Sequence, residues 1–346
     1  MIFRELNNAK CKTYLLASEG TMRAALVDPV KDHIERYLGV LAYHRLALEL
    51  IIDTHTHADH RSGAHELSRL TDAPVAMHRR APAPHVTVHV EDGQLLEVGD
   101  FEIKVLYTPG HTPDSISLYA HDRVFTGDCL LIHGTGRADF AGGDAGEQYD
   151  SIAQKLFALP DATLVYPAHD YRGHTHSTIA EEKGSNPRLA GRSRAQYVDL
   201  MSNLGLPLPE GIQEALQPNQ SEIESSMMHF PTLAQLNSVR QLTAGEVAAR
   251  LAASSAPLLL DVREREEFTG ELGHIPGARL IPLRELPDHA SSELEQFKDM
   301  DIVVICRAGV RSTTAAAILA GLGFDHVCNL KGGMLDWNDS GLPIER

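Results

Sequence analysis

The segment LELIIDTHTHADH, residues 48–60, decides how the first part of this chain folds. It starts as the short, mostly apolar run of a buried strand. The strand ends abruptly in a loop with three histidines and one aspartate, His55-Thr56-His57-Ala58-Asp59-His60. These side chains converge only if the loop curls around a common centre, and imidazole and carboxylate ligands suit Zn, Fe or Mn. We therefore expect a metal site where this strand ends.

Three further candidate ligands follow other strand-like runs. His111 lies in TPGHT, Asp128 in TGD and His169 in YPAHD. A lone histidine would more often be an ordinary surface residue, but the clustering argues against that interpretation here. Loops at one end of a sheet sandwich would bring all of these side chains together. The candidate ligands are then His55, His57, Asp59, His60, His111, Asp128 and His169.

The length of the chain and the change in residue composition along it indicate two domains. The 346 residues exceed the roughly 150 of an average domain. Strands and loops fill an N-terminal domain over 1–204, and a stretch of Pro, Asn, Gln and Ser over 205–240 is typical of a connector. Strands that alternate with helices over 241–346 predict a second α/β domain with a mostly parallel sheet. The clearest expected elements are strands at 258–260 and 302–305 and helices at 149–159, 246–252 and 313–322.

Composition excludes several classes of protein. The net charge of −16 repels phosphate backbones, so nucleic acid is not an expected partner. No stretch approaches the roughly 20 apolar residues of a membrane helix, so no membrane association is expected. Four cysteines are too few and too scattered for a disulfide framework, and they suit a reducing cytoplasm.

A second chemical motif is CRAGVR, 306–311, between an expected strand and a helix. A cysteine at a strand end, next to a helix N-terminus and two arginines, is in a setting that lowers the thiol pKa. The N–H groups of the loop also form an anion cradle. The motif therefore suits a nucleophile that attacks a sulfur or phosphorus oxyanion, and its candidate catalytic residues are Cys306, Arg307 and Arg311. The other cysteines lack this setting and are expected to be structural: Cys11, Cys129 and Cys328.

The pattern HxHxDH, then His, Asp and His, resembles the metallo-β-lactamase superfamily over about residues 2–200, which implies an αββα sandwich. Within it, TGDCLLI, GRADF, YPAHDY and NPRL look like the persulfide dioxygenases, which oxidise glutathione persulfide with O2 to glutathione and sulfite. This resemblance implies one Fe(II) per chain, held by His55, His111 and Asp128. Two imidazoles and a carboxylate would leave iron positions open for substrate and O2.

The resemblance also implies a glutathione pocket with Arg137, Tyr171 and Arg188. Guanidinium groups bind carboxylates in bidentate fashion, and a phenol adds a directional hydrogen bond. The remaining four candidates, His57, Asp59, His60 and His169, would orient the ligands or hold a second metal. With two metals bridged by Asp128, the alternative is a glyoxalase II-like hydroxyacylglutathione hydrolase.

The C-terminal part resembles a rhodanese domain over about 240–346. The motifs DVRE, EF, GHIPGA and GGMLDW match, and a six-residue loop from Cys306 is the sulfurtransferase form. The resemblance implies that Cys306 takes sulfane sulfur from thiosulfate and passes it to glutathione. Asp261 and Arg263 are expected to brace the domain.

Together the two resemblances predict a bifunctional sulfur-metabolism enzyme. Its partners would be glutathione persulfide, O2, thiosulfate and glutathione, and a homodimer is left open. A rival interpretation from another class is a sulfane-sulfur carrier or sensor whose N-terminal domain is catalytically silent.

Overall fold

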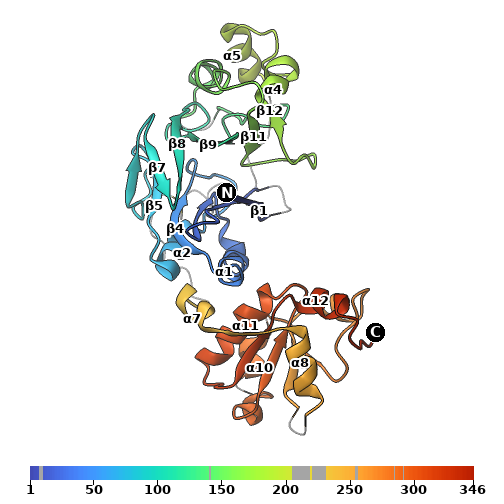
Figure 1. Cartoon of the computed structure of the whole chain (residues 1–346). Coiled ribbons are helices and arrows are strands. Elements are labelled where there is room, and N and C mark those ends of the chain that lie inside the picture. Colours follow the sequence, from blue (N-terminus) through green and yellow to red (C-terminus); the bar gives the residue numbers. More distant parts are fainter. Residues whose placement is uncertain are drawn as a thin grey trace. The chain divides into compact units, whose positions relative to one another are not determined.

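The protein is described here from a computed structural model of the chain (Figure 1). The structure describes residues 1–7, 11–139, 142–204, 219, 231–253, 256–283, 285–290 and 292–346. By residue contacts the chain divides into two compact units, Met1–Ile34 with Ala47–Ser226 and Glu35–Leu46 with Met227–Arg346. Most of the predicted connector, 205–240, lies outside the described residues, and its last part forms helix α7 and the first residue of strand β13.

Two six-stranded sheets form the first unit, in the orders β1-β2-β3-β4-β5-β6 and β12-β11-β10-β9-β8-β7. Side chains from both sheets, such as Leu16, Ile52, Ile103 and Phe125, share one buried cluster. The sheets therefore pack face to face across an apolar core. Their strands are β1 (Ile2–Glu5), β2 (Tyr14–Ala17), β3 (Arg23–Val27), β4 (Ala47–Ile52), β5 (Val75–His78), β6 (Val88–Val90), β7 (Leu95–Val98), β8 (Phe101–Tyr107), β9 (Ile116–Ala120), β10 (Arg123–Gly127), β11 (Leu164–Pro167) and β12 (Ser177–Thr178).

Helices cover the outer faces of this sandwich. Helix α2 packs on β4 and β5, while a second apolar cluster joins Val124 and Val165 of the other sheet to Ile152, Ile179 and Tyr197 of the helical layer. The expected αββα architecture is confirmed. The helical elements are η1 (Lys31–His33), α2 (Ala64–Thr71), α3 (Ala145–Ser151), the π-helix η2 (Ile152–Leu156), α4 (Ile179–Ser185) and α5 (Arg194–Ser202).

The helix expected over 149–159 begins earlier, at Ala145, and changes to a π-helical turn at Ile152. Asp144 explains the earlier start, because its side chain accepts a hydrogen bond from the Glu147 backbone N–H and caps the helix. The apolar spacing alone did not reveal this polar cap.

The candidate ligand loops all leave the C-terminal ends of strands. The loop 55–60, called the motif loop below, follows β4, while His111 follows β8, Asp128 follows β10 and His169 follows β11. Strands β10 and β11 are parallel neighbours, so Asp128 and His169 emerge at the same sheet edge. The fold thereby brings segments more than a hundred residues apart in sequence to one site.

The second unit is built on a sheet in the order β13-β17-β16-β14-β15, and every pair in it is parallel. Successive residues of its strands point to opposite faces, so Val304 packs with α10 and α11 and Val303 packs with α8 and α12. Figure 1 shows these helices around the sheet. The elements are α1 (Ile34–Tyr43), α7 (Leu233–Ser238), β13 (Arg240–Leu242), α8 (Ala244–Leu251), β14 (Leu258–Asp261), α9 (Arg265–Phe268), β15 (Arg279–Leu280), α10 (Leu286–Ala290), η3 (Glu295–Phe297), β16 (Ile302–Ile305), α11 (Val310–Gly321), β17 (Val327–Leu330) and α12 (Gly333–Asp339).

A fully buried ion pair braces this unit. The Arg263 guanidinium donates to both carboxylate oxygens of Asp261, at 2.7–3.1 Å, and to the Gly273 carbonyl at 2.8 Å. Removing one partner of such a pair costs roughly 3–5 kcal/mol, because the other charge is left buried and unpaired. The geometry supports the bracing role expected for Asp261 and Arg263.

Candidate metal centre and sulfur-transfer loop

The structure sorts the seven candidate ligands into separate clusters. His55, His111 and Asp128 form the first cluster; Asp59, His60 and His169 form a second together with Cys11; and His57 joins Asp28 and Asp53. Within each cluster, one potential ligand atom per residue lies within 4.8 Å of all the others. The resemblance had set His55, His111 and Asp128 apart from the other four candidates, but it predicted neither that Cys11 joins the second cluster nor that His57 lies with Asp28 and Asp53.

In the first cluster, two imidazole nitrogens face one carboxylate. Asp128 Oδ2 lies 4.0 Å from His55 Nε2 and 3.7 Å from His111 Nε2. The other ring nitrogens are anchored: His55 Nδ1 lies 3.0 Å from Thr54 Oγ1, and His111 Nδ1 donates to the Arg137 carbonyl at 2.6 Å. Anchored Nδ1 atoms leave the Nε2 lone pairs for a metal.

The charge states of the first cluster also suit a metal. Burial holds the pKa of His55 well below its usual value, so the ring is a neutral ligand. Burial alone would raise the pKa of Asp128, but His169, His111 and His55 outweigh it and keep the pKa below the usual range. A neutral His55, the His111 imidazole and the Asp128 carboxylate form a ligand set that suits a divalent metal ion.

His57 turns away from the first cluster. Its Nε2 donates to Asp28 Oδ1 at 3.3 Å, and Asp28 also accepts from the Thr54 N–H and hydroxyl. Because Thr54 contacts His55, this buried network connects His57 to the first cluster through Asp28. Burial raises the pKa of the neighbouring Asp53 to about 6.

Cys11 belongs to the second cluster, although its sequence context gave no sign of it. Residue 11 pairs with His169 in an isolated β-bridge, and the Lys12 N–H donates to the Ala168 carbonyl. This pairing brings Cys11 Sγ to 3.5 Å from Asp59 Oδ2. Burial alone would raise the pKa of the thiol, but hydrogen bonds with His169 and His60 outweigh it and lower the pKa.

Asn219 belongs to the predicted connector, and its side chain hydrogen-bonds to the backbone of the motif loop and of Ser62. Its side-chain amide donates to the His57 and His60 carbonyls, both at 2.8 Å, and its Oδ1 accepts from the Ser62 N–H at 2.9 Å. The side chain satisfies three backbone groups of the loop, so it fixes the loop's path. Nothing in the local sequence of a polar, proline-rich stretch signals this contact.

We predict that Asn219→Ala weakens metal binding by about 10–100-fold, since it loosens the loop that carries His55. Loss of its buried hydrogen bonds should also lower the free energy of unfolding by roughly 1–3 kcal/mol. Metal competition and thermal unfolding measure the two effects. Asn203→Ala is the matched control, because the Asn203 side chain is exposed and, among the described residues, bonds to Asp199 of its own helix end. Unchanged metal affinity in Asn219→Ala would contradict the positioning role.

Two of the three candidate glutathione contacts, Tyr171 and Arg137, touch candidate ligands, and the third, Arg188, bonds to Thr135. The Tyr171 ring is stacked parallel to His169, with centroids 6.0 Å apart, and is 65% exposed. Arg137 makes a bidentate pair with Asp139 while its carbonyl holds His111. Arg188 donates to the Thr135 carbonyl at 2.6 Å. The exposure of Tyr171 leaves it open to a ligand.

The cysteine loop of the second unit surrounds Cys306 with donors. Cys306 Sγ accepts from the Gly309 N–H at 3.1 Å and from the Ser312 hydroxyl at 3.2 Å. Gly309 adopts φ +88°, which favours glycine, and a Cβ there would lie 3.0 Å from a backbone nitrogen. Arg307 is exposed, whereas both terminal nitrogens of Arg311 donate to Glu267, at 2.6 and 2.7 Å.

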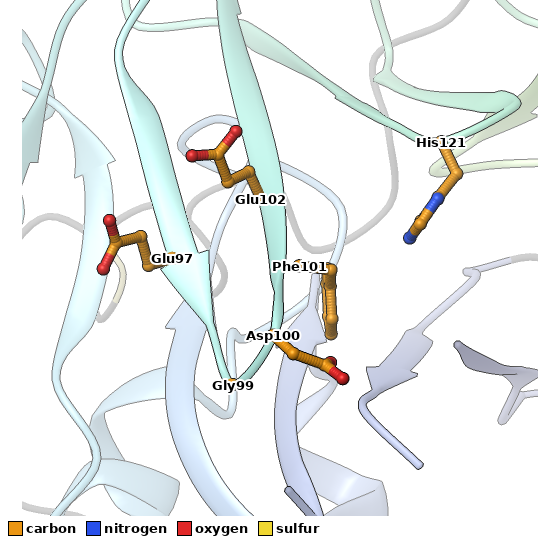
Figure 2. Close-up of a pocket in the computed structure, with 6 residues that line it drawn as sticks. All are labelled: Glu97, Gly99, Asp100, Phe101, Glu102 and His121. Carbon is orange, nitrogen blue, oxygen red and sulfur yellow. The ribbon is translucent and has the colours of Figure 1, made fainter. Parts of the chain in front are cut away.

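An open depression lies elsewhere on the first unit, at the turn between β7 and β8 (Figure 2). It measures about 470 Å³ and contains none of the candidate site residues. Its wall carries three acidic side chains. The lining residues are Glu97, Gly99, Asp100, Phe101, Glu102 and His121.

Comparisons with known proteins match one family model in each part of the chain. The family model "Metallo-beta-lactamase superfamily" matches residues 9–169, and "Rhodanese-like domain" matches residues 243–340. The human mitochondrial persulfide dioxygenase ETHE1 is 40% identical over 209 residues, which cover 60% of this chain and 82% of that protein. The crystal structure of ETHE1 from Myxococcus xanthus is 46% identical, with a TM-score of 0.62, over 64% of this chain and 98% of that one.

A metallo-β-lactamase structure from Staphylococcus aureus shares the fold, with 23% identity and a TM-score of 0.60, over 96% of this chain and 98% of that one. The fold and first cluster define the class, a metallo-β-lactamase-fold domain followed by a rhodanese domain. Within that class, the chain belongs to the family of the ETHE1 persulfide dioxygenases. In the described part of the chain, no helix is both long and apolar enough to cross a membrane.

Proposed function

We propose that this protein oxidises glutathione persulfide with O2 at an Fe(II) site and transfers sulfur between thiosulfate and glutathione at Cys306. The observation that carries the first activity is the convergence of His55 Nε2, His111 Nε2 and Asp128 Oδ2. We assign these three residues as ligands of one Fe(II) per chain. When bound, the iron would supply the redox chemistry that O2 requires.

In this proposal the chain binds and orients the persulfide beside that triad. Tyr171, exposed above His169, would contact glutathione, and Arg188 and Arg137 would bind its carboxylates. Before it can bind the ligand, Arg137 must break its ion pair with Asp139. An exposed ion pair of this kind is worth about 0–1 kcal/mol, so the exchange costs little.

At the second site, the Cys306 thiolate would attack the sulfane sulfur of thiosulfate. The sulfur–sulfur bond breaks, sulfite leaves with the electron pair, and Cys306 becomes a persulfide. A glutathione thiolate then takes the outer sulfur, which regenerates the Cys306 thiolate and yields glutathione persulfide. The Gly309 N–H and the Ser312 hydroxyl would stabilise the charge on Sγ.

The two activities share glutathione persulfide, so one domain would make the substrate of the other. The four free cysteines support a reducing compartment such as the cytoplasm. The substrates are small molecules, and the acidic net charge speaks against nucleic acid.

The decisive experiment measures O2 uptake with glutathione persulfide and metal content on the same anaerobically purified sample. We expect O2 consumption proportional to iron, up to one iron per chain. The glyoxalase II-like alternative instead predicts two metals per chain and hydrolysis of a glutathione thioester without O2. A carrier or sensor would consume no O2.

A further inference from the structure

We propose that Asn329 is a positioning residue of the sulfur-transfer site, because its side-chain amide fixes the loop that holds Cys306. The inference rests on the proposed function, in which Cys306 is the nucleophile of sulfur transfer. Asn329 lies on β17 and is fully buried. Its Nδ2 donates to the Gly309 carbonyl at 3.1 Å. Gly309 is also the residue whose N–H donates to Cys306 Sγ, so Asn329 acts one residue away from the sulfur.

The register of the parallel sheet explains why residue 329 reaches this loop. Strand β16 runs directly into Cys306, and β17 lies beside it with Asn329 paired to Val304, two residues before the cysteine. On its other side, β17 pairs with β13, where Gln241 is the partner of Asn329. Gln241 Oε1 accepts a hydrogen bond of 2.6 Å from Asn329 Nδ2. Two acceptors therefore use both protons of this amide nitrogen and hold the amide in one orientation.

The backbone of Gly309 is held on both sides of its Cα atom. Its carbonyl accepts from Asn329 and also from the Thr313 hydroxyl at 2.8 Å and the Thr313 N–H at 3.3 Å. A glycine at φ +88° would otherwise rotate more freely than any other residue. An anchored carbonyl limits this rotation and thus fixes the direction of the N–H that faces Cys306 Sγ. The donor is in place before the negative charge on sulfur has to be stabilised.

The other half of the Asn329 amide indicates that this residue does not serve stability alone. Its Oδ1 is buried and makes no hydrogen bond with any described residue. Buried polar atoms are normally paired, because an unpaired one destabilises the folded state. Leucine has the same branched shape and the same number of side-chain heavy atoms, and it would leave no such orphan atom. The amide at this position is therefore best explained by what its Nδ2 does for the loop.

The test measures how fast iodoacetamide alkylates Cys306 in the full-length protein, by mass spectrometry of the peptide that contains it. Asn329→Leu removes the donor but keeps the branched shape, and thermal unfolding should stay close to that of wild type. We expect the alkylation rate at neutral pH to fall about 10-fold. Loss of a whole donor to a developing charge costs 10²–10³-fold, and Thr313 still holds part of the loop. The pH profile of alkylation should also move to higher pH, which a merely structural role would not cause.

Asn338→Ala is the matched control for this variant. The Asn338 amide also donates to two carbonyls of the second unit, those of Leu272 at 3.1 Å and Met334 at 2.7 Å. Neither carbonyl belongs to the loop 306–311, so the alkylation rate and its pH profile should stay at wild-type values. Asn329→Ala is a smaller variant that should reproduce the effect of Asn329→Leu if leucine does not fit.

A wild-type rate and pH profile in folded Asn329→Leu or Asn329→Ala protein would overturn the proposal. An equal loss of rate in Asn338→Ala would also overturn it, because the effect would then be a general loosening of the domain. Sulfur transfer from thiosulfate to glutathione is measured separately. If wild type lacks that activity while the Asn329 variants still alter Cys306 alkylation as expected, the proposed sulfurtransferase fails and the positioning role stands.

Discussion

Replacing Asp128 with alanine should remove most bound iron and abolish O2 consumption with glutathione persulfide. Asp128 supplies the only anionic group of the first cluster and faces both His55 Nε2 and His111 Nε2. The two imidazoles alone would hold the dication far more weakly, by at least about 100-fold, since even groups that only hydrogen-bond to a metal ligand contribute 10–100-fold. Iron content and O2 uptake, measured on the same preparation, report the effect.

His60→Ala is the comparison for this variant, because His60 lies in the second cluster. It should keep most of the iron that Asp128→Ala loses. Asp128→Asn preserves the size of the side chain and guards against an effect of misfolding. Full O2 uptake by Asp128→Ala would reject the iron site, and equal loss of iron from the Asp128 and His60 variants would favour the two-metal hydrolase.

Cys306→Ser should separate the two activities. A serine hydroxyl keeps the shape but stays protonated at neutral pH, so no protein persulfide can form. Thiosulfate plus glutathione should then drive no O2 uptake, whereas preformed glutathione persulfide should drive it at close to the wild-type rate. An oxygen electrode with the two substrate mixtures measures both outcomes, and wild type should respond to both.

Arg311→Ala should give a weaker version of the same separation. Arg311 is paired with Glu267, so part of its charge is already neutralised at the loop. The nucleophile itself remains, and the rate with thiosulfate should fall but not vanish. If Cys306→Ser lost oxygenase activity while its fold and iron content stayed intact, the two-site scheme would be wrong.

The features that could be predicted from the sequence are those whose residues lie close together along the chain. The motif loop 55–60 and the CRAGVR loop each hold their chemical groups within a few residues, so spacing alone indicated both sites. The parallel sheet of the second unit followed from alternating strands and helices. His111, Asp128 and His169 each come directly after a strand-like run. Because the ends of neighbouring strands lie at one edge of a sheet, this position was enough to predict that the three residues meet.

What could not be predicted depends on contacts between distant segments. Cys11 reaches the second cluster only because its loop pairs with residue 169, and this pairing has no local pattern. The resemblance grouped His57 with Asp59, His60 and His169, whereas His57 hydrogen-bonds to Asp28 and lies in a cluster with Asp28 and Asp53. A lone polar residue such as Asn219 carries no sequence signal for the loop it holds.

The position of Asn219 also has a consequence for the order in which the protein matures. The residue lies 157 positions after Ser62 and 162 after His57, its hydrogen-bond partners. At a synthesis rate of roughly 5–20 residues per second, the nascent motif loop waits about ten seconds or longer for this side chain to be made. A fragment that ends at residue 204 would include every candidate ligand but would lack this support. Tight metal loading should thus come late in biosynthesis, after the polypeptide has extended past residue 219.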